Sequence, residues 1–168
     1  MKNLILMMLI VLSPLAQAGE PEMKEVREMY FFAAKDEEKC LEMISLLSSQ
    51  KENNSLLWGY LASAEMLMAK HAFNPFTKMD YFKKGRAKLD EAIAKDPENM
   101  ELRALRLAVQ KNAPSFLNYS SDMEEDKTLI IKKWQTTSDA PLKKHLISLM
   151  QRSDSMSSSE LASLQDNI

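Results

Sequence analysis

The chain has 168 residues, of which 22 are basic and 24 acidic, and its formal net charge is −2. A charge so close to neutral excludes whole-chain electrostatic attraction to nucleic acid or anionic lipid. Cys40 is the one cysteine, which excludes a disulfide framework and cysteine-rich zinc sites, so packing must hold the fold. Its place beside Leu41 and Ile44 favours an inert, partly buried thiol over a reactive one.

The first eighteen residues have the three parts of a secretory signal. Lys2 supplies the basic start, residues 4–12 are an unbroken apolar run, and residues 16–18, Ala-Gln-Ala, form a small-x-small cleavage sequence. The run is shorter than the roughly 20 residues that a membrane-spanning helix needs. Gly19 stands where a lipoprotein would have cysteine. We therefore expect cleavage after Ala18 and a periplasmic or secreted protein without stable membrane insertion.

Apolar residues beyond the signal recur with helical spacing, and strand-like alternation is almost missing. The sequence therefore predicts an all-α domain over residues 19–152, with about seven helices paired as antiparallel hairpins. The expected helices span residues 22–34, 36–49, 56–71, 79–95, 97–112, 124–136 and 140–152. Residues 153–168 are expected to form a serine-rich tail with room for a short terminal helix.

Two prolines mark expected connections between helices. Pro75 lies in residues 73–78, FNPFTK, which we expect to be a long loop. Pro97 separates two helices, because the residue before proline avoids helical angles and proline fits a helix's first turn. Gly59 and Gly85 fall inside expected helices, where small residues usually permit two helices to approach closely.

Four positions around the helix of residues 79–95 resemble a tetratricopeptide repeat. The second helix of that repeat has small, bulky, small and proline positions, and here the relative spacings 0, 4, 7 and 12 are held by Gly85, Leu89, Ala92 and Pro97. The first half departs from the pattern, since residues 58–60, Trp-Gly-Tyr, are crowded together. The resemblance covers one divergent repeat, about residues 56–99, and implies a right-handed stack of hairpins.

A longer resemblance runs from about Trp58 to Trp134. The stretches NPFTKMDYFKKG, AIAKDPENMELRALR, NAPSFLNY and EEDKTLIIKK are similar to an uncharacterised family of small exported helical proteins of Bacteroidota-type bacteria. This resemblance implies export and a helical, repeat-like fold, and it carries over no catalytic residue. Asp154-Ser155-Met156 also resembles the short Asp-Ser/Thr-apolar motif that some Bacteroidota glycosylate, and we expect it in a flexible linker.

Patterns of catalytic chemistry are sparse. His71 and His145 are too far apart for the helical zinc-protease motif, and neither a glycine-rich phosphate loop nor a G-x-S-x-G elbow occurs. Residues 124–126, Glu-Glu-Asp, open a helix, where capping and compensation of the helix dipole explain them. We therefore expect a protein that is not an enzyme and has no cofactor or resident metal.

Three features could carry binding. Arg103 and Arg106 could clamp an anion on a concave surface, or pair with carboxylates of the chain; the candidate carboxylates are Glu98, Glu101 and Glu65. An aromatic group around Pro75 could line a peptide groove or plug the long connection onto the core; it comprises Phe73, Phe76, Tyr81 and Phe82. Trp134 could be an exposed anchor or a lid on the last hairpin. The candidate partner-binding residues are Arg103, Arg106, Phe76 and Tyr81.

The leading hypothesis is an exported, non-catalytic module that binds an unknown protein or peptide. Stacked helical hairpins form curved surfaces, and such surfaces with mixed charge usually hold partners. The alternative is a small carrier of an apolar ligand or lipid, since ten of the 13 methionines remain after the signal is removed. Nucleic acid is not an expected partner.

Overall fold

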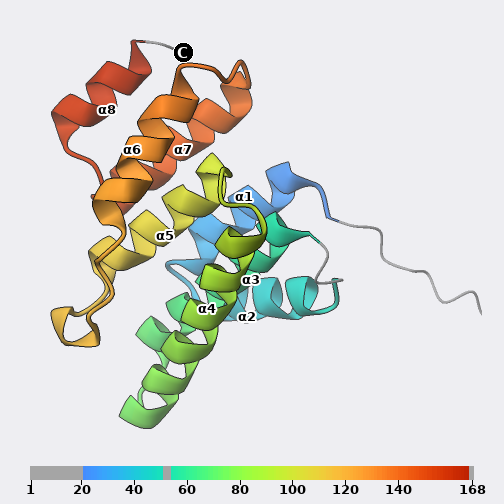
Figure 1. The fold of residues 1–168 in the computed structure, drawn as a ribbon. Helices are drawn as coiled ribbons and strands as arrows, with labels where there is room; N and C mark the ends of the chain where they lie inside the picture. The colour runs from blue at the N-terminus through green and yellow to red at the C-terminus, as the bar shows by residue number, and fades with distance from the viewer. Residues whose placement is uncertain (1–20, 51–53, 167–168) are drawn as a thin grey trace, which may run out of the picture.

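The computed structural model describes residues 21–50 and 54–166, so the predicted signal peptide, residues 1–18, lies outside the described part. Within those ranges the chain forms eight α-helices and a short 3-10 helix, with no strand (Figure 1). The elements are α1 Met23–Ala33, α2 Glu37–Ser48, α3 Ser55–His71, α4 Pro75–Lys95, α5 Met100–Asn112, η1 Ser115–Leu117, α6 Met123–Trp134, α7 Ala140–Ser153 and α8 Ser158–Gln165. The predicted all-α class built from helical hairpins is confirmed.

Side-chain caps explain why most helices begin where they do. The Asp36 carboxylate accepts the backbone N–H of Lys39, and the amides of three asparagines each accept two N–H groups in the first turn of the next helix. These asparagines are Asn54, Asn74 and Asn99. Ser157 and Glu160 form a reciprocal capping box at α8. The positions at which these helices start therefore follow from hydrogen bonds that are local in the sequence.

The expected long loop over residues 73–78 is wrong. Asn74 caps α4 and Pro75 occupies its first position, where a missing N–H costs nothing. The α3–α4 connection is therefore only residues 72–74. The helix expected to begin at Pro97 begins later. Asn99 caps α5 and Met100 is its first residue, so Pro97 lies in the turn before it.

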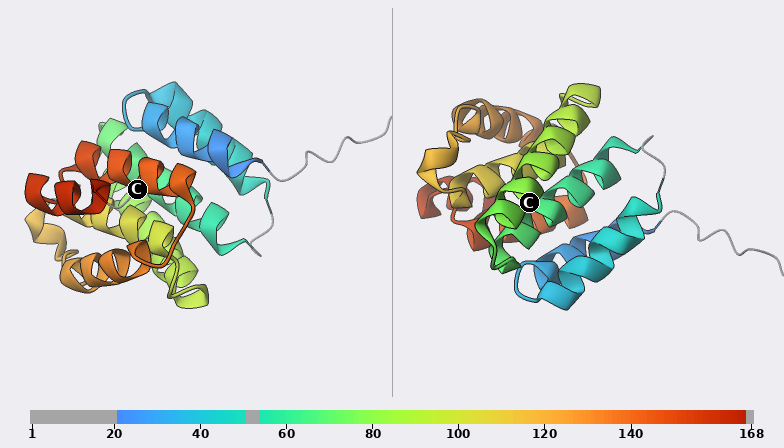
Figure 2. Two further views of the ribbon diagram at one scale, coloured as in Figure 1. Left: turned by 90° about the horizontal axis from the view of Figure 1, so that it is seen from above. Right: turned by 90° about the horizontal axis from the view of Figure 1, so that it is seen from below.

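The helices pack as successive hairpins, with α5 near the middle of the array (Figures 1 and 2). Each odd-numbered helix from α1 to α5 contacts the next odd-numbered one, and α5 also contacts α4 and α6. The α5 helix is buried over almost its whole length. The right-handed tetratricopeptide stack stays a prediction.

The first and last odd-numbered helices also meet. The centroids of the Phe31 ring on α1 and the His145 ring on α7 lie 5.2 Å apart. The Arg152 guanidinium, also on α7, lies over the Phe31 ring, 4.6 Å from its centroid. Phe31 thus links α1 to α7 by two side-chain contacts.

The serine-rich segment packs onto the fold. Leu161 and Leu164 of α8 are buried, and the Trp134 indole N–H donates to the Leu164 carbonyl at 2.9 Å. Ser155 is also buried, and its hydroxyl lies 2.9 Å from that of Ser153. The expectation that the Asp154-Ser155-Met156 motif lies in a flexible linker is therefore wrong.

The α3 and α4 helices approach each other closely at Gly85. A Cβ atom added at Gly85 would lie 2.5 Å from the Ala62 carbonyl oxygen and 2.5 Å from Cγ of Met66. The backbone of α3 cannot yield as a flexible side chain could, so glycine is required for this approach. The close helix approach that the sequence predicts at Gly85 is therefore present, and it explains why a side chain would not fit there.

We expect Gly85→Ala to lower the free energy of unfolding by about 1–3 kcal/mol, because the added methyl overpacks the α3–α4 contact. Urea denaturation of the purified protein measures this. Lys84→Ala, on the exposed side of the same helix, is the control and should change stability by less than about 0.5 kcal/mol. Equal values for the two variants would contradict the close approach.

Candidate functional site

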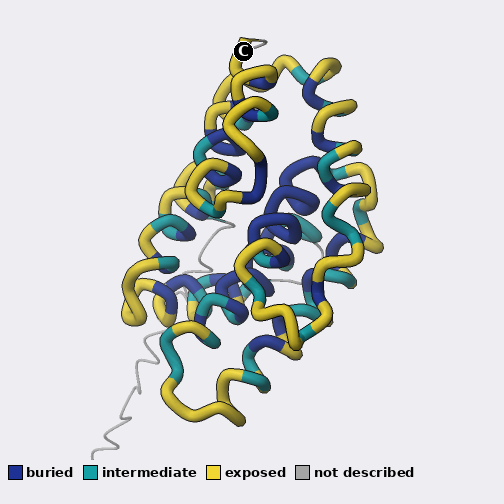
Figure 3. The backbone as a smooth tube through the Cα atoms, turned by 90° about the vertical axis from the view of Figure 1, so that its left-hand side faces the viewer, coloured by how far each residue is buried: buried dark blue, intermediate teal, exposed yellow. Residues whose placement is uncertain are grey.

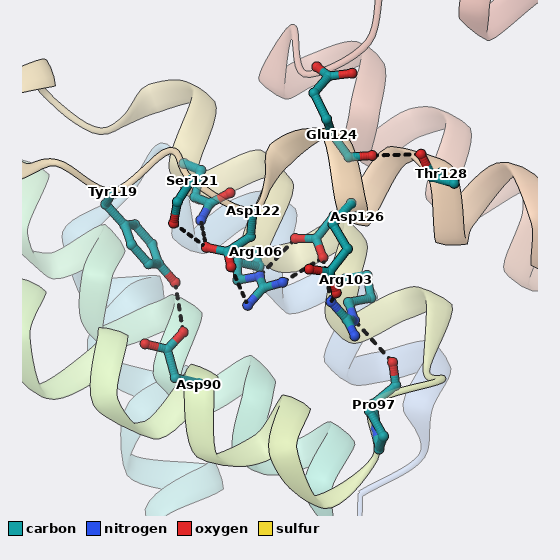
Figure 4. Close-up of polar contacts among 12 residues, drawn as sticks. Asp90, Pro97, Arg103, Arg106, Tyr119, Ser121, Asp122, Glu124, Asp126 and Thr128 are labelled. Carbon is teal, nitrogen blue, oxygen red and sulfur yellow. Dashed lines mark hydrogen bonds and ion pairs between the residues drawn. The ribbon is translucent and has the colours of Figure 1, made fainter.

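Arg103 and Arg106 lie one turn apart on α5 and converge on Asp126 of α6 (Figure 4). Arg106 donates from Nε and Nη2 to the two carboxylate oxygens at 2.7 and 2.6 Å, a bidentate pair. Arg103 donates from Nη1 to Asp126 at 2.9 Å and to Glu125 at 2.7 Å. Its Nε donates to the Pro97 carbonyl at 3.0 Å. Asp126 is fully buried and both arginines are nearly so.

The carboxylates expected to pair with these arginines are engaged elsewhere. Glu98 pairs with Lys133, Glu101 with Arg27 and Glu65 with Lys88. Asp122 completes the arginine cluster from the α6 N-cap position, 3.6 Å from Arg106. The two guanidinium groups are therefore held by the chain's own carboxylates, and they do not form an open clamp for a partner's anion.

A second buried network joins four helices through Glu101. Its carboxylate accepts two hydrogen bonds from Arg27 of α1, at 2.8 and 2.7 Å, and one from the Tyr60 hydroxyl of α3 at 2.5 Å. Nε2 of His145, on α7, lies 2.8 Å from the same hydroxyl. Because the single Tyr60 proton is directed to Glu101, we assign the Nε2 hydrogen to His145, which donates to the Tyr60 oxygen.

Burial sets the protonation states in this network. Burial is the main cause that lowers the pKa of His145 from 6.5 to about 4; the Glu101 charge opposes it and the Arg27 charge adds to it. Burial and the neighbouring Glu101 raise the pKa of Tyr60 well above its ordinary value. At neutral pH the network therefore holds a neutral imidazole and a protonated phenol beside one arginine–carboxylate pair.

These groups are of the kind that catalyse proton transfer, but their position favours a structural role. Tyr60 is fully buried and Glu101 nearly so, and each Glu101 oxygen accepts from at least one neighbour. A substrate would have to displace α1 or α7 to reach them. The network clamps α1, α3, α5 and α7 together.

Two open surface hollows flank the α5 and α6 region, with volumes of about 430 and 390 Å³. The first is lined by Glu98, Glu124, Glu125, Thr128, Leu129 and Lys132. The second shares Glu98 and includes Asp96, Lys133 and Thr136.

Among residues 21–50 and 54–166, no three histidine, cysteine or acidic side chains gather so that they could hold a metal ion. In the same ranges no helix has the length and apolar character of a membrane span.

The aromatic group expected around Pro75 is divided by the structure. Phe82 is buried against Tyr119, with ring centroids 5.6 Å apart, and Tyr81 is partly buried against the core. Phe73 and Phe76 are 97% and 82% exposed at the tip of the α3–α4 hairpin, so for these two the expected plug onto the core is wrong. The tip projects beyond the other helices (Figure 1), and Figure 3 shows its connection exposed.

Besides Phe32 on α1, which is 64% exposed, Phe116 in η1 is exposed at 74%. It belongs to the yellow-orange loop between α5 and α6, which points to the same side of the molecule as the green hairpin tip (Figure 1). Tyr119 of this loop packs on Phe82 of α4, so the two projections are joined. We call Phe73, Phe76 and Phe116 the aromatic end.

Two other candidate residues lie inside the fold. Trp134 is buried, with the Lys143 ammonium 5.4 Å from its ring centroid, which resolves it as a lid on the last hairpin and not an exposed anchor. Cys40 is buried with its thiol 3.3 Å from the Ala64 carbonyl oxygen, and burial raises its pKa to about 11. A thiol with this pKa is a poor nucleophile at neutral pH.

Comparisons with models of protein families, with curated proteins and with solved structures find no match to this chain.

We expect Asp126→Asn to lower the free energy of unfolding by about 3–5 kcal/mol, because it leaves Arg103 and Arg106 buried without their shared counter-charge. Glu125→Gln is the matched control. Its side chain is mostly exposed, and its loss should cost less than about 1 kcal/mol. Urea denaturation at neutral pH compares the two variants, and similar losses would show that the buried pairing is not the stabilising one.

The His145 environment gives a signed pH dependence. Its pKa is about 4 in the folded chain and 6.5 ordinarily, so between these values the unfolded chain binds the extra proton. Stability should therefore fall as pH drops from about 6.5 to about 4, by about 3 kcal/mol from this residue. We expect the wild-type unfolding free energy to lose this amount relative to His145→Gln. An unchanged slope in His145→Gln would refute the assignment.

Proposed function

We propose that this chain is an exported, non-catalytic interaction module whose contact surface is the aromatic end. The observation that carries the proposal is the near-complete exposure of Phe73 and Phe76 on a projecting hairpin. Burying a phenylalanine side chain is worth roughly 1.5–3 kcal/mol, and the fold forgoes that gain twice at one tip. Adjacent exposed apolar residues of this kind mark interaction sites more often than single exposed ones do.

The rest of the chain supports a contact at this end over one on the arginines. Arg103 and Arg106 were the first candidates, but Asp126 and its neighbours already neutralise them. Where α1 and α7 meet, Phe31 already contacts both His145 and Arg152. A peptide lying there would have to displace the chain's own side chains.

The alternative of an apolar-ligand carrier has less support. Six of the methionines pack inside the hydrophobic core; they are Met43, Met66, Met68, Met100, Met150 and Met156. The two hollows on the surface are open and have charged residues in their walls. Export remains part of the proposal and is supported by the signal-like pattern of residues 1–18.

Photo-crosslinking in cells that export the protein tests the contact surface without assuming the partner's class. We expect p-benzoylphenylalanine in place of Phe76 to give several-fold more light-dependent adduct, protein or lipid, than the same residue in place of Ile131. Ile131 is an exposed apolar position on α6, which makes it the matched control. Equal yields at the two positions, or none at either, would refute the aromatic end as the contact surface.

A further inference from the structure

We propose that the aromatic end docks this protein reversibly on an anionic bilayer surface. The inference rests on the proposed function, because it names the partner of the same contact surface. Its basis is the combination of three features: the convex shape of the aromatic end, the common direction of its two projections, and the charge beside it.

The shape favours a fluid partner. Phe73 lies in the α3–α4 connection and Phe76 in the first turn of α4, and all residues from 73 to 78 are exposed. The two hollows beside α5 and α6 are lined by residues of other elements. A narrow convex tip can bury both rings in a rigid partner only if that partner has a matching pocket. The interface of a bilayer accepts such side chains without a preformed pocket.

The two projections can reach one surface together. The α3–α4 tip and the loop that carries Phe116 lie on the same side of the molecule (Figure 1), and the Phe82–Tyr119 ring contact holds the loop against α4. Arg86 also lies 4.6 Å from the Tyr119 ring centroid, which adds a second link between loop and helix. Three phenylalanines thus lie on two projections that side-chain contacts of Tyr119 join.

The charge beside the tip is opposite to that of the chain. Residues 70–84 contain four exposed lysines and one acidic residue, Asp80, whereas the whole chain has a net charge of −2. The lysines are Lys70, Lys78, Lys83 and Lys84. Lysine has a long apolar stem, so a ring can enter the interface while the ammonium stays among anionic headgroups. Lys70 also donates to the Ala34 carbonyl of the α1–α2 turn at 3.4 Å, close in sequence to the acidic start of α2 at residues 36–38.

Sedimentation with vesicles tests the proposal on the chain from Gly19 to Ile168, the form expected after signal cleavage, which contains every described helix. The vesicles contain 30% phosphatidylglycerol in phosphatidylcholine, or phosphatidylcholine alone. We expect partitioning to the anionic vesicles, reduced at least tenfold by Phe73→Ser/Phe76→Ser and at least threefold by Lys70→Glu/Lys78→Glu. Ile131→Ser should partition as the wild type does.

A second readout reports insertion directly. In a Phe73→Trp variant, the added indole should shift to shorter emission wavelength with anionic vesicles and should be quenched by brominated acyl chains. We expect each variant to fold, because all the substituted side chains are exposed. Circular dichroism checks this.

Each outcome decides between the two proposals. No partitioning of the wild type, or equal partitioning of the wild type and the double phenylalanine variant, overturns the membrane inference. If protein adducts still form from position 76 in cells, the proposed function stands and the partner is a protein. If position 76 also gives no more adduct than position 131, both proposals fail.

Discussion

The burial of charge along α5 is the constraint on which the rest of the structure depends. Glu101 on one side of this helix binds α1 through Arg27 and α3 through Tyr60, and the Tyr60–His145 hydrogen bond extends this network to α7. Arg103 and Arg106 on the other side bind α6 through Asp126. A buried charge without its partner costs several kcal/mol, so each of these helices must return to one position relative to α5. The hydrophobic core supplies most of the buried area, and we infer that the buried charges select among the packing arrangements it would allow.

The sequence was sufficient for the elements and insufficient for the pairings between them. Helical periodicity and the Asp36 cap predicted most helix bounds, because both signals are local. The Asn74–Pro75 pair was mistaken for a loop because the same residues serve as a break and as a cap followed by a first turn. The spacing of Arg103 and Arg106 correctly placed them on one face. Their counter-charge was not predictable, since nothing local distinguishes Asp126 from the acidic residues beside it.

The candidate site changed for the same reason. Charged residues attract functional interpretation in a sequence, yet the geometry shows that the arginines of α5 are satisfied inside the fold, with bidentate and charge-assisted hydrogen bonds. Phe73 and Phe76 looked like packing residues because phenylalanine is usually buried. Only the direction of the hairpin, which periodicity does not specify, leaves them in solvent. The candidate contact surface is therefore the exposed aromatic tip and not the arginine pair of α5.

The contact between α1 and α7 distinguishes this chain from an open array of helical hairpins. In such an array each unit touches only its neighbours, so terminal units can fray independently and unfolding can spread along the row. Here Phe31 connects the first hairpin to His145 and Arg152 of the last, and both ends also join at Glu101. The first and last helices of the row, α1 and α7, are therefore in contact with each other. Loss of either terminal hairpin would then break contacts at both ends of the row, so we expect the domain to unfold as one cooperative unit.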